Sequence, residues 1–285
     1  MPRKVFLEIT NVCNLSCDFC PGTERKPAFM PYDMFEKLLV KLDGYADYLY
    51  FHLMGEPLLH PELFRMIAEA NRAGFRTMIT TNGTLLADRG DALADSGVFK
   101  VSISMHAFHA GMVPFVVGTK AVTPEAYGIP CVRFARRAAK NGVITVFRLW
   151  NLENGVCDGK NDAVLSLLHA SFPGEWQKNR SGFRLSERIY LEWGEHFSWP
   201  DPKEPDYGEK GFCYGLRDQL GILCDGTVVP CCLDRNGVMA LGNLCDSTLS
   251  DILSSERARS IYDGFSRRRT AEQLCRHCGY AVRFR

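Results

Sequence analysis

The chain has 285 residues, of which 46% are hydrophobic and 11% aromatic, so it has enough apolar material for a folded core and is too apolar to be disordered. Its 34 Lys and Arg residues balance 33 Asp and Glu residues, which excludes the broad positive field of an obligate nucleic-acid binder. No apolar run approaches the roughly 20 residues that span a bilayer, and the N-terminal stretch carries Glu8. We therefore expect a cytoplasmic protein with no nucleic-acid partner and no membrane partner.

Hydrophobic patterning over the first 195 residues alternates strands with helices. Strands are predicted at residues 5–10, 48–53, 77–81, 100–104, 143–149 and 188–195, and helices at residues 32–42, 61–72, 85–95, 132–140 and 163–170. The intervening residues 106–130 are rich in Gly and Pro and are predicted to form a long loop or lid. Six such units indicate an α/β fold with a parallel sheet, helices on its outer face, and functional residues at the carboxyl ends of the strands.

The composition changes near residue 200, where the stretch WPDPKEPDYGEKG combines three prolines with many charges, as linkers do. Beyond it we expect short strands around a Gly turn and helices near residues 248–253 and 256–265. We predict a core domain at residues 1–198 and a small α+β domain at residues 199–285. Core burial alone is too little to stabilise a domain of this size, so a metal centre is expected to contribute.

Three of the twelve cysteines lie close together after the first predicted strand. In a chain without a secretion signal, so many cysteines indicate metal binding before disulfides. A tight loop can wrap Cys13, Cys17 and Cys20 around one [4Fe-4S] cubane and leave the fourth iron open. Part of a zinc site is the alternative, although structural zinc prefers four ligands in paired spacing.

The CxxxCxxC loop, with Phe19 directly before its last cysteine, resembles the signature of the radical S-adenosylmethionine (radical SAM) enzymes. The resemblance implies a partial (β/α)6 barrel and a [4Fe-4S] cluster whose open iron binds S-adenosylmethionine (SAM). One electron from that cluster cleaves SAM to methionine and a 5′-deoxyadenosyl radical, which abstracts a hydrogen atom from the substrate. An electron donor of the flavodoxin or ferredoxin type is implied as a partner. The last 35 residues hold eight arginines and four acidic residues. This excess of positive charge indicates either a solvated helix face or a docking surface for such a donor.

Later strand ends match the SAM-binding positions of this family. Met54-Gly55-Glu56-Pro57 resembles the GGEP motif, with Met54 in place of the first Gly, and Thr80-Thr81-Asn82-Gly83 resembles the TNGT turn. The VSIS strand and the end of the next strand correspond to contacts with the ribose, carboxylate and adenine. The SAM contacts that the resemblance implies are Gly55, Glu56, Pro57, Thr81, Asn82, Ser102, Ser104, Arg148 and Leu149. Taken singly, each motif is also an ordinary turn or strand position.

A second cysteine set lies in the C-terminal region. Its four thiols, from a hairpin and a terminal CxxC, suit a closed zinc site or a fully ligated [4Fe-4S] cluster, and their spacing does not distinguish the two. The pattern resembles the SPASM extension of radical SAM enzymes, which carries auxiliary [4Fe-4S] clusters. The implied ligands are Cys213, Cys231, Cys275 and Cys278. Cys232 is the alternative to Cys231, and because adjacent strand residues point to opposite faces, only one of the two is expected at the cluster.

With the sequence stopping at Arg285, one auxiliary cluster is expected, as in the shortened twitch extension of the 2-deoxy-scyllo-inosamine dehydrogenases, which oxidise an alcohol on an aminocyclitol. The expected reaction is hydrogen abstraction followed by net oxidation of a small molecule, and no acid/base residue is singled out. The first alternative is modification of a ribosomally made peptide by thioether or carbon–carbon crosslinking or by epimerisation. Because the first strand is predicted to begin at residue 5, we expect no leader-binding domain in this sequence, which disfavours the peptide alternative but leaves it open, since that domain can be a separate protein. The alternative from another class is a zinc-binding structural or adaptor protein.

Overall fold

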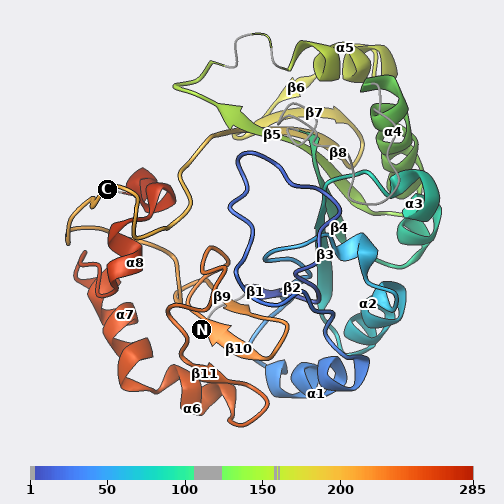
Figure 1. The fold of residues 1–285 in the computed structure, drawn as a ribbon. Coiled ribbons are helices and arrows are strands. Elements are labelled where there is room, and N and C mark those ends of the chain that lie inside the picture. Colours follow the sequence, from blue (N-terminus) through green and yellow to red (C-terminus); the bar gives the residue numbers. More distant parts are fainter. Residues whose placement is uncertain (1–3, 106–123, 157–158, 160, 285) are drawn as a thin grey trace.

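The computed structural model describes residues 4–105, 124–156, 159 and 161–284. Within these residues one sheet of eleven strands runs in the order β11-β10-β9-β1-β2-β3-β4-β5-β8-β7-β6 and curves around a central space (Figure 1). Its middle consists of β1 (Lys4–Leu7), β2 (Tyr48–Tyr50), β3 (Arg76–Thr81), β4 (Lys100–Ser104), β5 (Ile144–Leu152) and β8 (Ile189–Glu195). Neighbours among these six strands are all parallel, which confirms the predicted unclosed partial barrel.

Five helices cover the outer side of this sheet in the predicted order (Figure 1). They are α1 (Tyr32–Leu42), α2 (Leu63–Arg72), α3 (Leu86–Asp95), α4 (Pro124–Lys140) and α5 (Asp162–Ser171). The prediction that residues 106–130 form a loop was wrong for its last part, because α4 begins at Pro124. Tyr127, Cys131 and Phe134 form a buried stripe at helical spacing, which carries the helix through Pro130. The predicted lid over residues 106–123 lies outside the described residues.

Two hairpins extend the sheet beyond the six predicted barrel strands; the hairpin at residues 177–186 was not predicted, whereas the strands around the Gly226 turn were. β6 (Gln177–Lys178) and β7 (Gly182–Ser186) pair in antiparallel fashion and lead into β8. β9 (Gln219–Ile222), β10 (Thr227–Val229) and β11 (Gly242–Asn243) come from the C-terminal region. β9 lies parallel to β1, so the C-terminal hairpin completes the edge of the sheet next to the first strand.

The C-terminal region ends in α6 (Leu249–Leu253), α7 (Glu256–Ser266), α8 (Gln273–Arg276) and a 3-10 helix at Gly279–Phe284. One hydrophobic core contains Leu7 of β1 together with Ile222 of β9 and Phe265 of α7, so the two predicted domains share buried surface. Several of the C-terminal arginines pair with carboxylates, as in Arg257–Glu272, which favours an ordinary charged surface there. No helix among the described residues is long and apolar enough to cross a membrane.

Candidate active site

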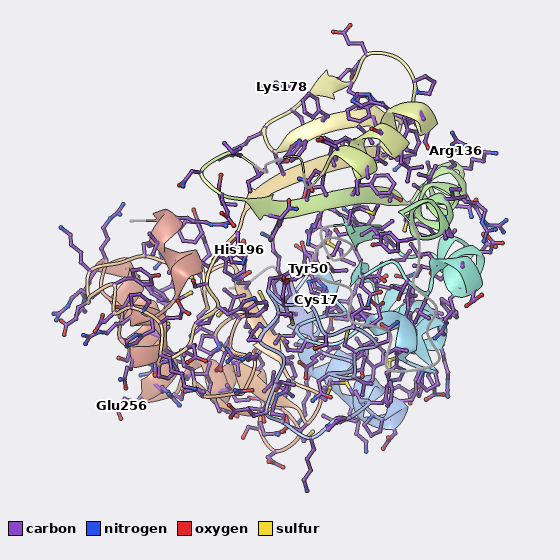
Figure 2. The ribbon with its side chains drawn as sticks, turned by 45° about the horizontal axis from the view of Figure 1, so that its top comes forward. Cys17, Tyr50, Arg136, Lys178, His196 and Glu256 are labelled. Atoms are coloured by element: carbon purple, nitrogen blue, oxygen red, sulfur yellow. The ribbon has the colours of Figure 1, made fainter. Side chains whose placement is uncertain are left out.

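The loop that follows β1 carries Cys13, Cys17 and Cys20, and all three line one cavity of about 250 Å³ inside the barrel opening. Figure 2 shows Cys17 near the centre of the molecule, whereas Arg136 and Lys178 lie at its periphery. Burial, together with the smaller effect of the neighbouring thiols of Cys20 and Cys13, raises the pKa of the Cys17 thiol to about 12. A bound cation reverses this effect and holds such thiols as thiolates.

The donor chemistry of this loop fits a [4Fe-4S] cluster with one open iron. Three soft sulfur donors line the cavity, and no fourth cysteine among the described residues does so. Within the described part of the chain, no group of three or more His, Cys, Asp or Glu residues meets the geometry for holding a metal ion. The assignment therefore rests on the shared cavity and the thiol chemistry.

The turn at Gly55 fastens the base of the cysteine loop. Gly55 has φ +75°, and a Cβ there would lie 2.5 Å from the Thr10 carbonyl oxygen and 2.8 Å from the Val12 carbonyl oxygen. The next residue, Glu56, donates its backbone N–H to that Val12 oxygen at 2.8 Å. Only glycine allows the two backbones to approach this closely. Pro57 is buried at the start of the 3-10 helix Pro57–Leu59 and does not line the cavity.

The Glu56 carboxylate joins this turn to the end of β3. It accepts hydrogen bonds from the Thr81 hydroxyl at 2.7 Å, the Asn82 backbone N–H at 2.7 Å and the Leu58 backbone N–H at 3.0 Å. Burial raises the pKa of the Glu56 carboxyl to about 7, against the opposite effect of these donors. Glu56 thus has two roles. It lines the cavity, and its carboxylate holds the Gly55 turn and the end of β3 in place.

Asn82 connects the end of β3 to the cysteine loop. Its side-chain amide donates to the Asn14 oxygen at 2.9 Å and lies 3.9 Å from the Cys13 sulfur. Its backbone carbonyl accepts a hydrogen bond from the Tyr127 hydroxyl at 2.7 Å, which ties α4 to this turn. The predicted contacts at positions 55, 56, 81, 82 and 104 thus share one cavity with the three cysteines.

Three other predicted SAM contacts lie elsewhere. Ser102 is buried in β4, and the Leu149 side chain is fully buried in the hydrophobic core. Arg148 lines two neighbouring cavities, not the cavity of the cysteine loop. Side chains alternate along β5, so Arg148 and Leu149 face opposite sides of the sheet. Their roles in SAM binding stay predictions.

The second cysteine set lines a cavity of about 260 Å³ between the C-terminal segment and the sheet. The cysteines at this cavity are Cys213, Cys231, Cys232, Cys275 and Cys278. Burial raises the pKa of the Cys231 thiol well above its usual range, and the thiols of Cys213, Cys232 and Cys275 add to the effect. The expectation that strand alternation turns Cys232 away was wrong, because the pair follows the end of β10 in a turn. All four predicted ligands meet here, and their chemistry fits a fully ligated cluster.

A third cavity of about 240 Å³ lies between the two cysteine-lined cavities, and we call it the middle cavity. It shares Thr80 and Ser104 with the first cavity and Arg148 and Cys232 with the second. His52 lines all three. The three cavities therefore adjoin one another, with a cysteine set at each end.

His52 is the central polar group of this space. Its Nε2 lies 3.2 Å from the Thr80 hydroxyl, and its Nδ1 has no hydrogen-bond partner among the described residues. Burial lowers the pKa of the His52 imidazole to about 3, so the ring is neutral at physiological pH. No local pattern in the sequence predicted that Phe197 and Trp199 line the middle cavity, because they lie in an irregular segment after the last barrel strand.

A buried ion pair links the two cysteine sites. Glu8 is fully buried and accepts from Arg25 at 2.7 Å, from the Met54 backbone N–H at 3.2 Å and from the Cys224 backbone N–H at 3.2 Å. Arg25 also donates to the carbonyl oxygen of Arg235, close after the second cysteine pair, at 2.8 Å. A single carboxylate thus joins the first cysteine loop, the Met54 turn and the C-terminal hairpin.

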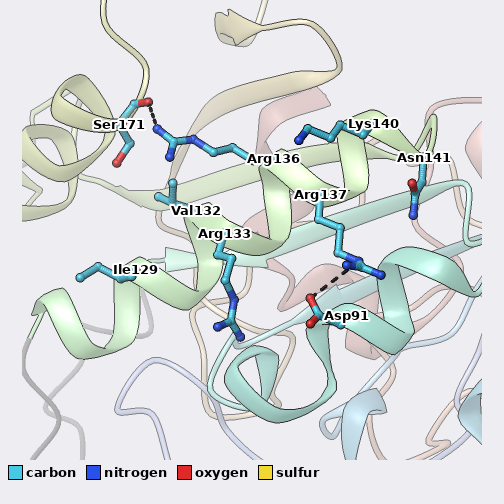
Figure 3. A pocket seen from close by; sticks show the side chains of 9 residues that line it. All are labelled: Asp91, Ile129, Val132, Arg133, Arg136, Arg137, Lys140, Asn141 and Ser171. Carbon is cyan, nitrogen blue, oxygen red and sulfur yellow. Dashed lines mark hydrogen bonds and ion pairs between the residues drawn. The ribbon is translucent and has the colours of Figure 1, made fainter.

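Another cavity, of about 830 Å³, lies on the outer surface along α4 (Figure 3). Basic side chains of that helix line it, and three of them are engaged locally: Arg133 with the Ala87 carbonyl oxygen, Arg136 with the Ser171 carbonyl oxygen and Arg137 with Asp91. It shares no lining residue with the three inner cavities. We therefore place the chemistry inside the barrel.

Comparison with known families agrees with this geometry. The family model of the radical SAM superfamily matches residues 7–151, and the model of the SPASM iron-sulfur cluster-binding domain matches residues 213–279. The chain belongs to the radical SAM superfamily and carries a SPASM domain. These domains imply [4Fe-4S] clusters, with SAM as the cofactor of the first.

Individual relatives differ in how much of their length is shared. The GTP 3′,8-cyclase of Aquifex aeolicus is 32% identical over 272 residues, which cover 88% of this chain and 83% of that protein. The tungsten-containing aldehyde ferredoxin oxidoreductase cofactor-modifying protein of Pyrococcus furiosus is 40% identical over 108 residues, 36% of this chain and 30% of that protein. The chain spans only about a third of that protein and of other curated relatives that it matches.

Solved structures share the fold at low sequence identity. BtrN in complex with AdoMet and 2-DOIA has a TM-score of 0.59 and 18% identity, over 98% of this chain and 93% of that chain. SuiB of Streptococcus suis bound to the precursor peptide SuiA has a TM-score of 0.61 and 16% identity, over 98% of this chain and 70% of that chain. Both likenesses concern the arrangement of the chain, and neither identifies the substrate.

Proposed function

We propose that this radical SAM enzyme carries out a net two-electron oxidation, such as alcohol to ketone, of a small molecule held in the middle cavity. The observation that supports the proposal is that the middle cavity shares lining residues with both cysteine-lined cavities. When bound, SAM and the first cluster supply the 5′-deoxyadenosyl radical for hydrogen abstraction, and the auxiliary cluster supplies an electron-accepting centre.

The chain's own residues hold and enclose this chemistry. Cys13, Cys17 and Cys20 would bind the first cluster and leave one iron for SAM. The auxiliary ligands would be Cys213, Cys231, Cys275 and Cys278. Aromatic side chains on the walls of the middle cavity exclude water, which protects a reactive radical from side reactions.

The surroundings of such an enzyme follow from its chemistry. A reducing compartment keeps the eleven cysteines of the described residues as free thiols, so we propose the cytoplasm. We propose a flavodoxin or ferredoxin as the one-electron donor.

A second candidate function is the modification of a ribosomally made peptide. It is supported by the fold shared with SuiB, whose structure contains a precursor peptide. In that case the middle cavity, at about 240 Å³, would take one side chain of the peptide. A precursor-peptide gene beside the gene for this chain favours peptide modification, whereas a neighbouring set of sugar or aminocyclitol genes favours small-molecule oxidation.

Iron content after anaerobic reconstitution tests the two-cluster proposal. We expect about eight irons per chain, which corresponds to two [4Fe-4S] clusters. Cys275→Ala is expected to lose the auxiliary cluster and with it about half of this iron. Cys17→Ala is expected to lose the first cluster, which is the other half of the iron, and no longer to form 5′-deoxyadenosine.

Cys245→Ala is the matched control, because Cys245 is exposed and lines none of the three inner cavities. We expect this variant to keep all of its iron. About four irons in the wild type contradict the auxiliary cluster, and zinc without iron supports the zinc-binding protein instead.

A further inference from the structure

The segment at residues 21–25, which we call the arm, follows Cys20 and forms part of the wall of the first cavity. Gly22 and Thr23 line this cavity together with the three cysteines of the loop. Among the described residues, the hydrogen bonds that Thr23 and Glu24 make outside their own loop all go to residues 235 and 236. The first of these contacts joins residues that are 212 positions apart in the sequence. The C-terminal region therefore holds one wall of the cavity that contains the first cysteine loop.

Asn236 supplies the acceptor that fastens the arm. Its side-chain Oδ1 accepts a hydrogen bond from the Glu24 backbone N–H at 3.0 Å and lies 2.9 Å from the Thr23 hydroxyl oxygen. The same hydroxyl lies 3.0 Å from the Arg235 carbonyl oxygen, so its single proton serves two acceptors. A backbone N–H and a hydroxyl of the arm thus share one acceptor atom, the Oδ1 of Asn236.

The turn that carries Asn236 begins and ends at the second cysteine cavity. Leu233 and Met239 line that cavity, and the residues between them do not. The buried carboxylate of Asp234 closes the turn, because it accepts hydrogen bonds from two backbone N–H groups at the end of the turn, at 2.9 Å and 2.7 Å. The Met239 sulfur lies 3.6 Å from the Cys275 sulfur. The base of this turn therefore lies at the second cysteine set, and its tip lies at the arm of the first.

Arg235 anchors the tip of the turn on its other side. Its guanidinium donates to the Pro200 carbonyl oxygen at 3.0 Å and pairs with Asp201 at 2.9 Å. Burial raises the pKa of the Cys20 thiol, whereas the Gly22 backbone N–H and the positive charge of Arg235 act against this rise. The tip is thus fixed in place and lies within electrostatic range of the first cysteine loop.

We propose that Asn236 is a positioning residue of the SAM site, and that through its turn the auxiliary site controls how tightly SAM binds. A binding site keeps its shape only where a second layer of contacts holds its lining residues, and Asn236 provides that layer for the arm. The inference goes beyond the proposed oxidation and does not depend on it, because SAM is the cofactor of the first cluster whichever substrate is modified. It requires clusters in both cysteine sets, which iron content tests separately.

Equilibrium dialysis of SAM against the reconstituted holoenzyme tests the role of Asn236. Asn236→Ala is expected to weaken SAM binding about three- to tenfold, which is the size of effect that lost hydrogen bonds produce. Asn236→Asp keeps an acceptor oxygen at this position and is expected to bind SAM as the wild type does. Asn179→Ala is the matched control, because Asn179 also accepts a backbone N–H, from Ser181 at 3.0 Å, but lies between β6 and β7. It should leave SAM affinity unchanged.

Three outcomes of this experiment overturn the proposal. Unchanged SAM affinity in Asn236→Ala shows that the contact does not position the site. An equal loss in Asn236→Asp shows that the acceptor oxygen is not the cause. An Asn236→Ala variant that loses the iron of the first cluster, instead of losing SAM affinity at full iron content, shows a merely structural role.

Cys275→Ala tests whether the auxiliary site acts through this turn. Loss of the auxiliary cluster is expected to weaken SAM binding about as much as Asn236→Ala does. The variant with both substitutions is expected to bind SAM no more weakly than either alone, because both interrupt one path. Losses that multiply in the double variant overturn the proposal, as does wild-type SAM affinity in Cys275→Ala. Iron content shows separately whether the wild type holds the auxiliary cluster, so failure of the two-cluster proposal and failure of this inference are distinguishable.

Discussion

The two cysteine sites are built in opposite ways. Cys13 and Cys20 are exposed on a loop whose position depends on hydrogen bonds and close backbone contacts with other turns. In contrast, Cys278 is buried, and the other cysteines at its cavity come from the segment before β9, from the turn after β10 and from α8. The first site must leave room for a cofactor, so it has an incomplete sulfur set and an external scaffold. The second has a complete sulfur set within its own walls.

The largest expected effect comes from cutting the ion pair that joins the two sites. Arg25→Ala leaves the Glu8 carboxylate buried without its cation, which we expect to cost about 3–5 kcal/mol of unfolding free energy. The damage should concentrate in the first site, because Arg25 holds the returning arm of the cysteine loop. Urea unfolding gives the stability, and the rate of iron loss to a chelator gives the effect on each cluster.

Arg72→Ala is the matched control for this variant. Arg72 also pairs with a glutamate, Glu69, but its side chain is 70% exposed, so its removal is expected to cost about 0–1 kcal/mol. Similar losses in both variants, or equally fast iron loss from both clusters, would show that the Glu8 pair does not hold the first site specifically.

The next effect tests the backbone contact below the first site. Gly55→Ala introduces a Cβ at φ +75° against the carbonyl oxygens of Thr10 and Val12, and we expect a loss of about 2–4 kcal/mol together with weaker SAM binding. Gly44→Ala is the control, because φ there is +74° and no atom lies within 4 Å of the added Cβ. It should cost about 1 kcal/mol and leave SAM binding unchanged. Equilibrium dialysis measures SAM affinity, and thermal unfolding measures stability. The difference between the two variants separates the effect of the steric contact from that of backbone strain. Equal effects of the two variants would contradict a role for the close contact at Gly55.

The same contrast explains what the sequence predicted well. Patterns confined to a few residues were sufficient for the barrel strands, for α1, whose predicted bounds were Tyr32–Leu42, and for the first cysteine set. The second cysteine set is spread over the C-terminal region, and its members were grouped by their resemblance to the SPASM extension. Contacts between distant segments were not predictable, because local periodicity contains no information about partners. The parallel pairing of β9 with β1 and the bond from Arg25 to the carbonyl of Arg235 are such contacts. Glu8, a charged residue within an apolar predicted strand, was the one feature of the sequence that indicated the buried ion pair with Arg25.

The smallest expected effect is a pH dependence that separates the polar first site from the thiol-rich second one. Burial raises the pKa of the Glu56 carboxyl from its ordinary 4.5 to about 7. Between these values Glu56 keeps a proton in the folded chain that it has lost in the unfolded chain. The contribution of Glu56 to stability is therefore fully present below about pH 4.5 and is lost as the pH rises through 7. The total change is about 3 kcal/mol at most.

Thermal unfolding of the cluster-free chain between pH 5 and pH 8 measures this slope, with Glu56→Gln as the variant that lacks it. The two proteins have the same thiols, so the difference between their curves isolates the titration of residue 56. We expect the wild type to lose stability relative to Glu56→Gln as the pH rises. Parallel curves for the two proteins would mean that the donors from Thr81, Leu58 and Asn82 outweigh burial and keep Glu56 ionised in the folded state. The network that positions the first site would then contain a carboxylate at every pH at which the enzyme works.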